Sequence, residues 1–134
     1  MIGIADTGFL VAFSARRDAY FSWAHAIAEG VHDPLLTCEA VLAEAAFRLQ
    51  SAALVLRLLD TGLVRLAFDL KSHRAELAEL AQRYADRRPD LADLCLIRMS
   101  ELNPKHPIIT VDGDFRVYRR NRREAIPVIM PPEA

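Results

Sequence analysis

The sequence has little cysteine and little glycine, and it lacks any long uninterrupted apolar run. Its 134 residues include two cysteines and five glycines. Cys38 and Cys95 lie far apart and are flanked by apolar residues, which indicates reduced, buried thiols rather than a disulfide framework or a zinc site. Gly3 and Gly8 form no phosphate-binding loop. No apolar stretch is long enough to span a membrane, and the opening segment MIGIADTG lacks the features of a signal peptide. We therefore expect a soluble, cytoplasmic protein.

Neither sign of charge predominates, and the histidines form no metal-binding pattern. The 17 Lys and Arg residues nearly balance the 18 Asp and Glu residues, which leaves a formal net charge of -1. The overall charge therefore predicts no polyanionic partner, and any argument for nucleic-acid binding must be local. The four histidines show no ligand spacing with one another or with cysteine, and we interpret them as surface or core residues: His25, His32, His73 and His106.

About half of the residues are apolar, which is enough for one core but not for two, so residues 1–134 are expected to form a single domain. Apolar runs predict strands at 2–5, 35–37, 63–68 and 108–111, and a last edge strand at 126–129. Helical spacing, caps and breakers predict helices at 8–15, 20–29, 38–50, 51–60, 72–86 and 90–102. Strands separated by helices favour a mostly parallel sheet covered on both faces. The predicted fold class is α/β.

Acidic residues occur at the points where a parallel sheet binds ligands. Asp6 directly follows the first predicted strand and Asp112 follows the fourth, and ligands of such sheets lie beyond the carboxyl ends of the strands. These two acids are therefore expected to converge. Asp90 and Asp93 lie three residues apart at a predicted helix start, so both can point toward one spot.

A fifth acid, Glu44, lies inside a predicted helix. Its neighbours three and four positions away include Ala40, Val41 and Phe47, so its side chain shares a largely apolar stripe and needs a partner. Acids brought within a few ångströms of one another raise each other's pKa or repel, unless a divalent cation neutralises them. A ligand set made only of oxygen atoms suits magnesium or manganese rather than zinc.

Each acid also has a purely structural interpretation. Asp6 can simply cap the helix that follows it, and Asp90 can be an N-cap with Asp93 completing a pair similar to a capping box. Asp112 can belong to an ordinary turn. Glu44 is the hardest to explain in this way, because an acid inside a helix gains nothing from capping, although a partly exposed glutamate would fit the same pattern. The residues alone leave both interpretations open.

Four stretches follow one another along the chain: IADTGFLVAF, LLTCEAVLAEAAFRL, DLADLCLIRMSE and IITVDGDFRVYRR. In this order they resemble the PIN domain family and, within it, the VapC-type toxins of bacterial toxin-antitoxin pairs, and the resemblance covers nearly the whole chain. The acids of the family pattern match Asp6, Glu44, Asp93 and Asp112, and none is missing. Further positions of the family pattern would have supporting roles. Asp114 matches an acid that is often present in addition to these four, and Thr7 and Thr110 match hydroxyl neighbours of the acids. Asp90 matches a position that is acidic in only some relatives.

The resemblance implies a three-layer α/β/α PIN-like fold with a mostly parallel central sheet, and an endoribonuclease that depends on Mg2+ or Mn2+. Asp6 and Asp93 would be the core metal ligands, and Glu44 and Asp112 would bind a metal directly or through water. The metal would lower the pKa of a bound water that attacks phosphorus and would stabilise the transition state. The implied partners are an RNA substrate, a small antitoxin and a second copy of the chain, for which the apolar segment 38–59 could contribute a surface.

Residues 116–123, with the sequence RVYRRNRR, form a basic stretch shortly after Asp112. They could hold RNA phosphates near the metal, and we prefer Arg116 and Arg119 for this role, with Tyr118 available for stacking on a base. A solvated basic face explains the same pattern. The stretch could also bind an acidic or C-terminal antitoxin segment, because carboxylates and phosphates make the same demands on arginine.

Two other functions compete with the nuclease. A non-catalytic PIN module that binds RNA or protein would predict broken acids, whereas here they are intact. A phosphatase or phosphoacceptor domain of the doubly wound type would use Asp6 as its nucleophile. Against it, no lysine follows the fourth strand to hold a phosphate, and Glu44 would be left unexplained. The sequence does not distinguish a toxin from a standalone PIN nuclease.

Overall fold

A parallel five-stranded sheet forms the centre of the computed structural model, which describes residues 1–132. Its strands are β1 (Ile4–Ala5), β2 (Leu35–Thr37), β3 (Val64–Leu66), β4 (Ile108–Ile109) and β7 (Val128–Ile129). They lie in the order β3-β2-β1-β4-β7, and each neighbouring pair is parallel. The predicted α/β class is confirmed, and β7 occupies an edge as predicted.

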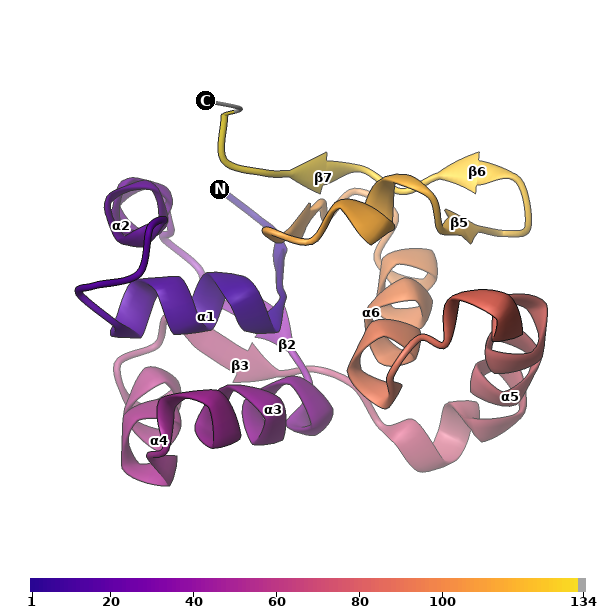
Figure 1. Ribbon diagram of the computed structural model, residues 1–134, viewed down its shortest axis with the longest axis horizontal. Helices are drawn as coiled ribbons and strands as arrows, with labels where there is room; N and C mark the ends of the chain where they lie inside the picture. The colour runs from indigo at the N-terminus through magenta and orange to yellow at the C-terminus, as the bar shows by residue number, and fades with distance from the viewer. Residues whose placement is uncertain (133–134) are drawn as a thin grey trace.

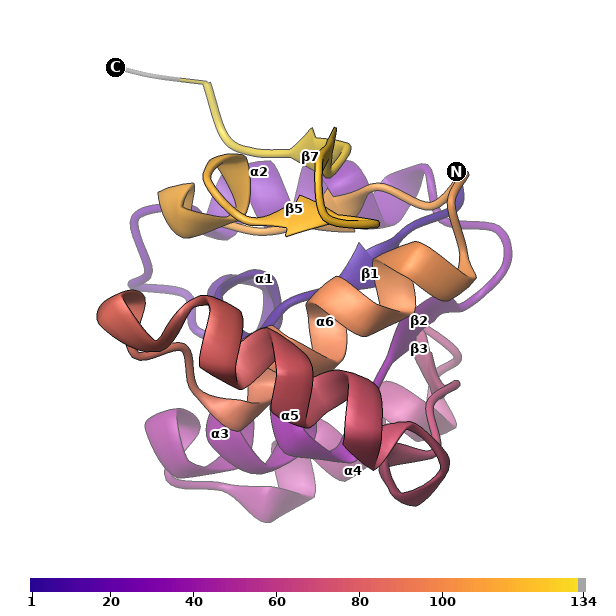
Figure 2. The same ribbon diagram turned by 90° about the vertical axis from the view of Figure 1, so that its right-hand side faces the viewer.

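Within residues 1–132, six α-helices flank the sheet: α1 (Thr7–Ser14), α2 (Phe21–Glu29), α3 (Glu39–Leu49), α4 (Ala52–Asp60), α5 (Arg74–Arg83) and α6 (Leu91–Leu102). In Figure 1, α1 to α4 gather on the left-hand side and α5 and α6 lie on the right. Figure 2 shows α5 and α6 on the side that faces the viewer, with α6 crossing in front of β1. The helix predicted at 72–86 is divided into a 3-10 turn η1 (Leu70–His73), α5 and a second 3-10 turn η2 (Ala85–Arg87). None of the helices in this range is long and apolar enough to cross a membrane.

Local capping signals explain why two helices begin where the sequence predicts. The Ser51 hydroxyl accepts a hydrogen bond of 3.2 Å from the backbone N–H of Leu54 at the start of α4. Asp90 and Asp93 form a complete capping box at the start of α6. Both arrangements satisfy backbone N–H groups that the first turn of a helix leaves without partners.

The hydrophobic core surrounds β1, β4 and α6. Fully buried side chains from these elements include Ile4, Leu96, Ile97, Ile108 and Ile109. Strands of a parallel sheet that are covered on both faces carry continuous apolar runs, because neither face meets water. This explains why the run ending at Asp6 is apolar up to the acid, and why the run before Asp112 carries a single polar residue, Thr110, which is itself buried.

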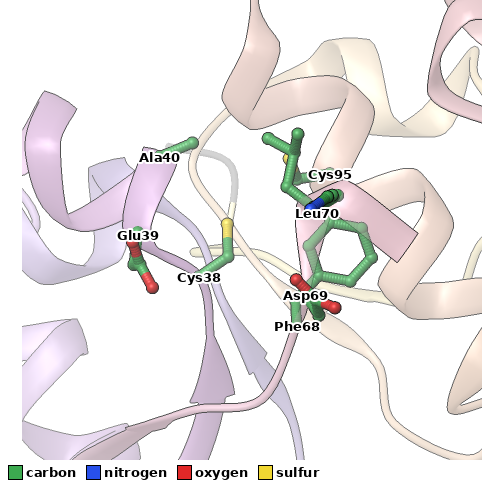
Figure 3. Close-up of a pocket in the computed structure, with 8 residues that line it drawn as sticks. Cys38, Glu39, Ala40, Phe68, Asp69, Leu70 and Cys95 are labelled. Atoms are coloured by element: carbon green, nitrogen blue, oxygen red, sulfur yellow. The ribbon is translucent and has the colours of Figure 1, made fainter. Parts of the chain in front are cut away.

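Cys38 and Cys95 are buried and free, as predicted. They line a pocket of about 300 Å³ together with side chains from the start of α3 and from the segment that enters η1. Figure 3 shows the sulfur of Cys38 directed into this space. None of the four acids predicted to be catalytic lines this pocket, so it is not the candidate active site.

A small antiparallel hairpin follows β4 and was not predicted. A 3-10 turn η3 (Gly113–Arg116) leads into β5 (Arg119–Arg120), which pairs with β6 (Glu124–Ala125). The turn between them places Asn121 and Arg122 at φ of 48° and 71°. Glycine usually supplies these left-handed conformations in hairpin turns, and its absence removed the signal by which the hairpin would have been predicted.

Gly8 lets the first turn of α1 pack directly against the end of β4. A Cβ atom at this position would lie 2.3 Å from Cγ2 of Val111, too close for van der Waals contact. We expect Gly8→Ala to lower the free energy of unfolding by about 1–2 kcal/mol, because overpacking costs about 1–3 kcal/mol and the gain in helix propensity returns at most about 1 kcal/mol. Urea unfolding measures this change.

The matched control for this substitution is Gly113→Ala, since a Cβ atom at Gly113 meets no atom within 4 Å. Its unfolding midpoint is expected to stay close to that of the wild type. Equal midpoints for the two variants would show that Val111 yields without cost and that close packing at Gly8 does not matter.

Candidate active site

One pocket gathers the predicted acids at the carboxyl ends of β1 and β4. It encloses about 160 Å³ and is lined by Asp6, Thr7, Gly8, Glu44, Arg48, Asp90, Asp93, Val111 and Asp112. The four acids predicted to be catalytic come from four separate segments and share this pocket, with the supporting residues Asp90 and Thr7 beside them. Their catalytic and metal-binding roles stay predictions.

The sheet register brings Asp6 and Asp112 together. In the neighbouring strands β1 and β4, Ile4 pairs with Ile108 and Ala5 with Ile109, so the chain leaves the sheet at adjacent points. Asp6 then becomes the N-cap of α1, and Asp112 becomes the N-cap of η3. The start of α6 and the middle of α3 complete the pocket.

Asp6 is buried and held by two hydrogen bonds. Its Oδ1 accepts from the backbone N–H of Thr7 at 2.6 Å, and its Oδ2 accepts from Oγ1 of Thr110 at 2.5 Å. Burial raises the pKa of Asp6 from 3.8 to about 6; the two hydrogen bonds oppose this rise, and the charges of Asp112 and Glu44 add to it. Asp6 is therefore a helix cap and also a member of the acid cluster.

Asp90 and Asp93 likewise combine capping with clustering. Oδ1 of Asp90 accepts from the backbone N–H of Asp93 at 2.9 Å, and Oδ2 of Asp93 accepts from the backbone N–H of Asp90 at 3.2 Å. Burial, followed by the nearby charge of Asp90, raises the pKa of Asp93 from 3.8 to about 7. A pure capping pair on an exposed helix end would not show such a rise, since solvent would stabilise the charge.

Glu44 projects from α3 toward the same pocket. Burial is the main reason why its pKa is raised, and its neighbour Asp90 adds to the effect. The hydroxyl of Thr7 lies near Glu44 and is buried. Among residues 1–132 it has no partner at the distance and angle of a hydrogen bond. A buried hydroxyl without a partner is costly unless a ligand or water satisfies it.

Asp112 and Asp114 are placed differently. Oδ1 of Asp112 accepts from the backbone N–H of Asp114 at 2.9 Å, while the backbone N–H of Asp112 donates to Oγ1 of Thr110 at 2.9 Å. The Asp114 carboxylate is 3.4 Å from a guanidinium nitrogen of Arg87 and does not line the pocket. Thr110 therefore connects Asp6 to Asp112, and Asp114 lies outside the cluster.

Comparison with known proteins identifies the fold. No family model matches the sequence, and no curated protein matches it. In structure, the chain is similar to VapC20 of Mycobacterium tuberculosis, a toxin that cleaves the sarcin-ricin loop, with a TM-score of 0.77 and 20% sequence identity over 95% of this chain and 100% of VapC20. The chain has the VapC-type PIN fold. At this identity the likeness establishes the fold, and it confirms the three-layer PIN-like prediction.

The pocket of this PIN fold suits a hard divalent cation in its chemistry. Its acidic lining offers only oxygen atoms, which magnesium and manganese prefer as ligands. A cation would stabilise the charged carboxylates and so offset the burial and the mutual repulsion that raise their pKa values. The unpartnered hydroxyl of Thr7 adds a further oxygen. As the side chains lie, no three acidic, histidine or cysteine residues among residues 1–132 form a ready ion site. Oxygens of Asp6, Asp90 and Asp93 face capping N–H groups instead.

Arg48 also lines the pocket, and the sequence-based interpretation of α3 missed it. It follows Glu44 by four residues, a spacing that places two side chains side by side on a helix. The same interpretation assigned Phe47 to an apolar stripe with Glu44, which is wrong, since Phe47 is 82% exposed. The i+4 spacing from Glu44 was the signal that could have identified Arg48.

The basic stretch 116–123 is not a single binding surface. Arg119 turns its Nη1 back onto the carbonyl oxygens of Arg116, Val117 and Tyr118, and Arg116 donates from Nε to the sulfur of Met130 at 3.2 Å. Neither arginine lines the acid pocket, and their role in RNA binding stays a prediction.

Tyr118 was expected to be available for stacking on a base, and this expectation is wrong. Its side chain is fully buried and makes edge contacts with the rings of Tyr84 and Phe115. The residue therefore belongs to the core of the PIN fold.

Proposed function

We propose that the protein is an endoribonuclease that hydrolyses phosphodiester bonds in RNA and depends on Mg2+ or Mn2+. The observation that carries this proposal is the convergence of Asp6, Glu44, Asp93 and Asp112 on one pocket from four segments of the chain. The VapC-type PIN fold supports it, because VapC20, which shares this fold, is a toxin that cleaves the sarcin-ricin loop.

The acids divide into fixed and adaptable positions. Asp6 is held by Thr7 and Thr110, so its carboxylate is oriented in advance, and Asp93 is held at the start of α6. These two would be the core ligands of the metal, and Glu44 and Asp112 would complete the set directly or through water. A bound divalent ion would supply a water of lowered pKa and neutralise charge on the phosphate. Orienting the attacking water falls to the remaining carboxylate oxygens.

The biological setting that fits this activity is a type II toxin-antitoxin pair in the cytoplasm. The support is the fold shared with the toxin VapC20. The partners would be a small antitoxin and a second copy of the chain. Growth arrest on expression that is relieved by a small protein encoded next to this gene would support the toxin assignment, and normal growth at high expression would oppose it.

Cleavage of a mixed pool of structured RNAs tests the enzymatic proposal. Purified protein is expected to cut RNA with Mg2+ or Mn2+, to stop cutting when a chelator is added, and to recover when excess metal is returned, because the acid pocket needs a cation to approach phosphate. Gel analysis of labelled RNA measures the cuts.

Three other outcomes have defined meanings. Intact RNA under both metals would contradict the nuclease and favour a non-catalytic binding module. Cleavage that persists in chelator would contradict the metal requirement. A phosphorylated Asp6, detected by mass spectrometry after incubation with a small phosphodonor, would favour the phosphoacceptor alternative.

A further inference from the structure

The acid pocket would repel a phosphodiester substrate, because both the pocket and the phosphate are negatively charged. Five carboxylate side chains line it, and they belong to Asp6, Glu44, Asp90, Asp93 and Asp112. Even with a cation among them, a nucleic-acid backbone needs a positive group that holds the phosphate in place. Within the described chain, Arg48 is the one basic residue in the lining.

The guanidinium of Arg48 is left free for a ligand. It is exposed, and in residues 1–132 its side chain takes part in no ion pair and no side-chain hydrogen bond. Its nearest acid in the sequence, Glu44, lies on the same side of α3 yet does not pair with it. By contrast, Arg87 pairs with Asp114, and Arg119 and Arg120 bind carbonyl groups of their own surroundings. Arg48 therefore keeps all its donors for a bound group.

Phe47 precedes Arg48 in the sequence and is the most exposed large apolar side chain in the described chain, at 82%. It lies three residues after Glu44, so on the helix surface it adjoins the acid just as Arg48 does. The core-facing side of α3 is formed by Val41, Leu42 and Ala45, so Phe47 contributes nothing to that core. Phe47 and Arg48 therefore flank Glu44 on the surface of α3. An exposed aromatic ring that can stack on a base, together with a free arginine that can bind a phosphate, is a combination that binds unpaired nucleotides.

We infer that the last turn of α3 is a nucleotide-binding subsite beside the acid pocket, in which Arg48 holds a backbone phosphate and Phe47 stacks on an unpaired base. The inference rests on the proposed function and narrows it to one class of substrate. RNA whose bases are splayed out, in a loop, bulge or single strand, can present a base to the ring. A continuous duplex cannot, because its bases are already stacked on one another.

Binding of a short single-stranded RNA to an inactive protein tests this subsite separately from cleavage. The probe is a fluorescently labelled RNA of eight nucleotides, and the background variant is Asp6→Asn. Arg48→Ala in this background is expected to weaken binding about tenfold and to reduce the slope of log K against log salt by about 0.7, because one phosphate contact is lost. Phe47→Ala is expected to weaken binding about tenfold without changing the salt slope, and Phe47→Leu to recover only part of the loss.

A matched pair on the next helix serves as the control. Leu56 and Arg57 are adjacent, exposed residues of α4 and do not line the acid pocket. Leu56→Ala and Arg57→Ala are expected to change the affinity less than twofold. A duplex RNA of the same sequence is expected to lose affinity with Arg48→Ala but to be insensitive to Phe47→Ala.

The two proposals can fail independently. If the wild type cleaves RNA but the Arg48 and Phe47 variants bind the probe as well as the background protein does, the subsite is wrong and the nuclease stands. If the wild type never cleaves but the variants lose affinity as described, the subsite stands and the nuclease is wrong. If Phe47→Ala leaves RNA binding unchanged and instead converts a dimer to a monomer in sedimentation, Phe47 belongs to an interface between protein chains and the stacking role is overturned.

Discussion

Asp6→Asn is expected to reduce RNA cleavage by about 100-fold or more at saturating Mg2+, while the protein remains folded. The substitution removes the negative charge but keeps the shape, so the carbonyl of the new asparagine side chain can still accept from the N–H of Thr7, and its amide can donate to the hydroxyl of Thr110. Loss of one preorganised electrostatic group in a catalytic site costs about 10²–10³ in rate. Single-turnover cleavage of the RNA pool measures the rate constant.

The same substitution is expected to make the metal-free protein more stable at neutral pH. Burial raises the pKa of Asp6 from 3.8 to about 6, so the charged form costs the folded state about 3 kcal/mol relative to the unfolded chain. Between pH 3.8 and 6 the folded state holds the proton more tightly, and this contribution to stability is lost as the pH rises through that window. The asparagine variant never carries the charge and lacks this loss.

Urea unfolding in chelator at pH 4 and pH 7 tests the sign. The advantage of Asp6→Asn over wild type should be larger at pH 7, and added Mg2+ should reduce it by stabilising the wild type alone. Asp33→Asn, at an exposed position, provides the control and should alter neither cleavage nor stability. Wild-type cleavage rates for Asp6→Asn would remove Asp6 from the active site, and a variant less stable than wild type at pH 7 would contradict the electrostatic argument.

Local signals in the sequence predicted most of the fold. Ser51 and the Asp90–Asp93 pair mark helix starts because their side chains satisfy backbone N–H groups within three residues, and such short-range bonding can be read from spacing. The apolar strand ending at Asp6 was predicted from its composition. A strand that is buried on both faces carries apolar residues in succession and does not alternate them with polar ones. The convergence of Asp6 and Asp112 then followed from parallel topology.

Residues whose environment depends on tertiary packing were predicted less well. Helical spacing identified Phe47 as a neighbour of Glu44, but which side of α3 meets the core is decided by α1 and the other helices packed against it. Tyr118 looked available because it lies among arginines, yet the turn before β5 directs it inward against Tyr84. Both errors concern the direction of a side chain and not the type of element that carries it.

The sequence could not separate a capping role from a place in the acid pocket, because in the structure the same side chains do both. Asp6 and Asp93 bind backbone N–H groups at helix starts and also line the acid pocket. The start of a helix favours negative charge, so the N–H groups that make these acids good caps also partly stabilise a cluster of carboxylates that would otherwise repel. Capping is thus one of the means by which the fold retains several acids in one place.

Arg120→Ala is expected to lower the free energy of unfolding by about 3 kcal/mol, because it leaves more than one buried acceptor without a donor. Arg120 is 5% exposed and donates to the carbonyl oxygens of Ser100 and Pro104, to the hydroxyl of Ser100, and to Oε1 of Glu124. Its removal leaves the buried acceptors of Ser100 without their donor, and a buried polar group that loses its partner costs about 1–3 kcal/mol. Glu124 is half exposed, so water can replace the guanidinium there.

Comparison with Arg120→Lys and Arg123→Ala separates the causes. Lysine keeps the charge but cannot reach the several acceptors at once, because it lacks the planar fork of the guanidinium, so it should recover less than half of the loss. Arg123 is exposed in the same turn, and its substitution should change the unfolding midpoint in urea very little. A loss below about 1 kcal/mol for Arg120→Ala would mean that water replaces the guanidinium and that the hairpin β5–β6 does not depend on this residue. If Arg120→Ala loses the full amount of about 3 kcal/mol in stability, it should still cleave RNA at low temperature, because Asp6, Glu44, Asp93 and Asp112 are unchanged. Its cleavage should fail at a lower temperature than that of the wild type, because the protein unfolds earlier on heating.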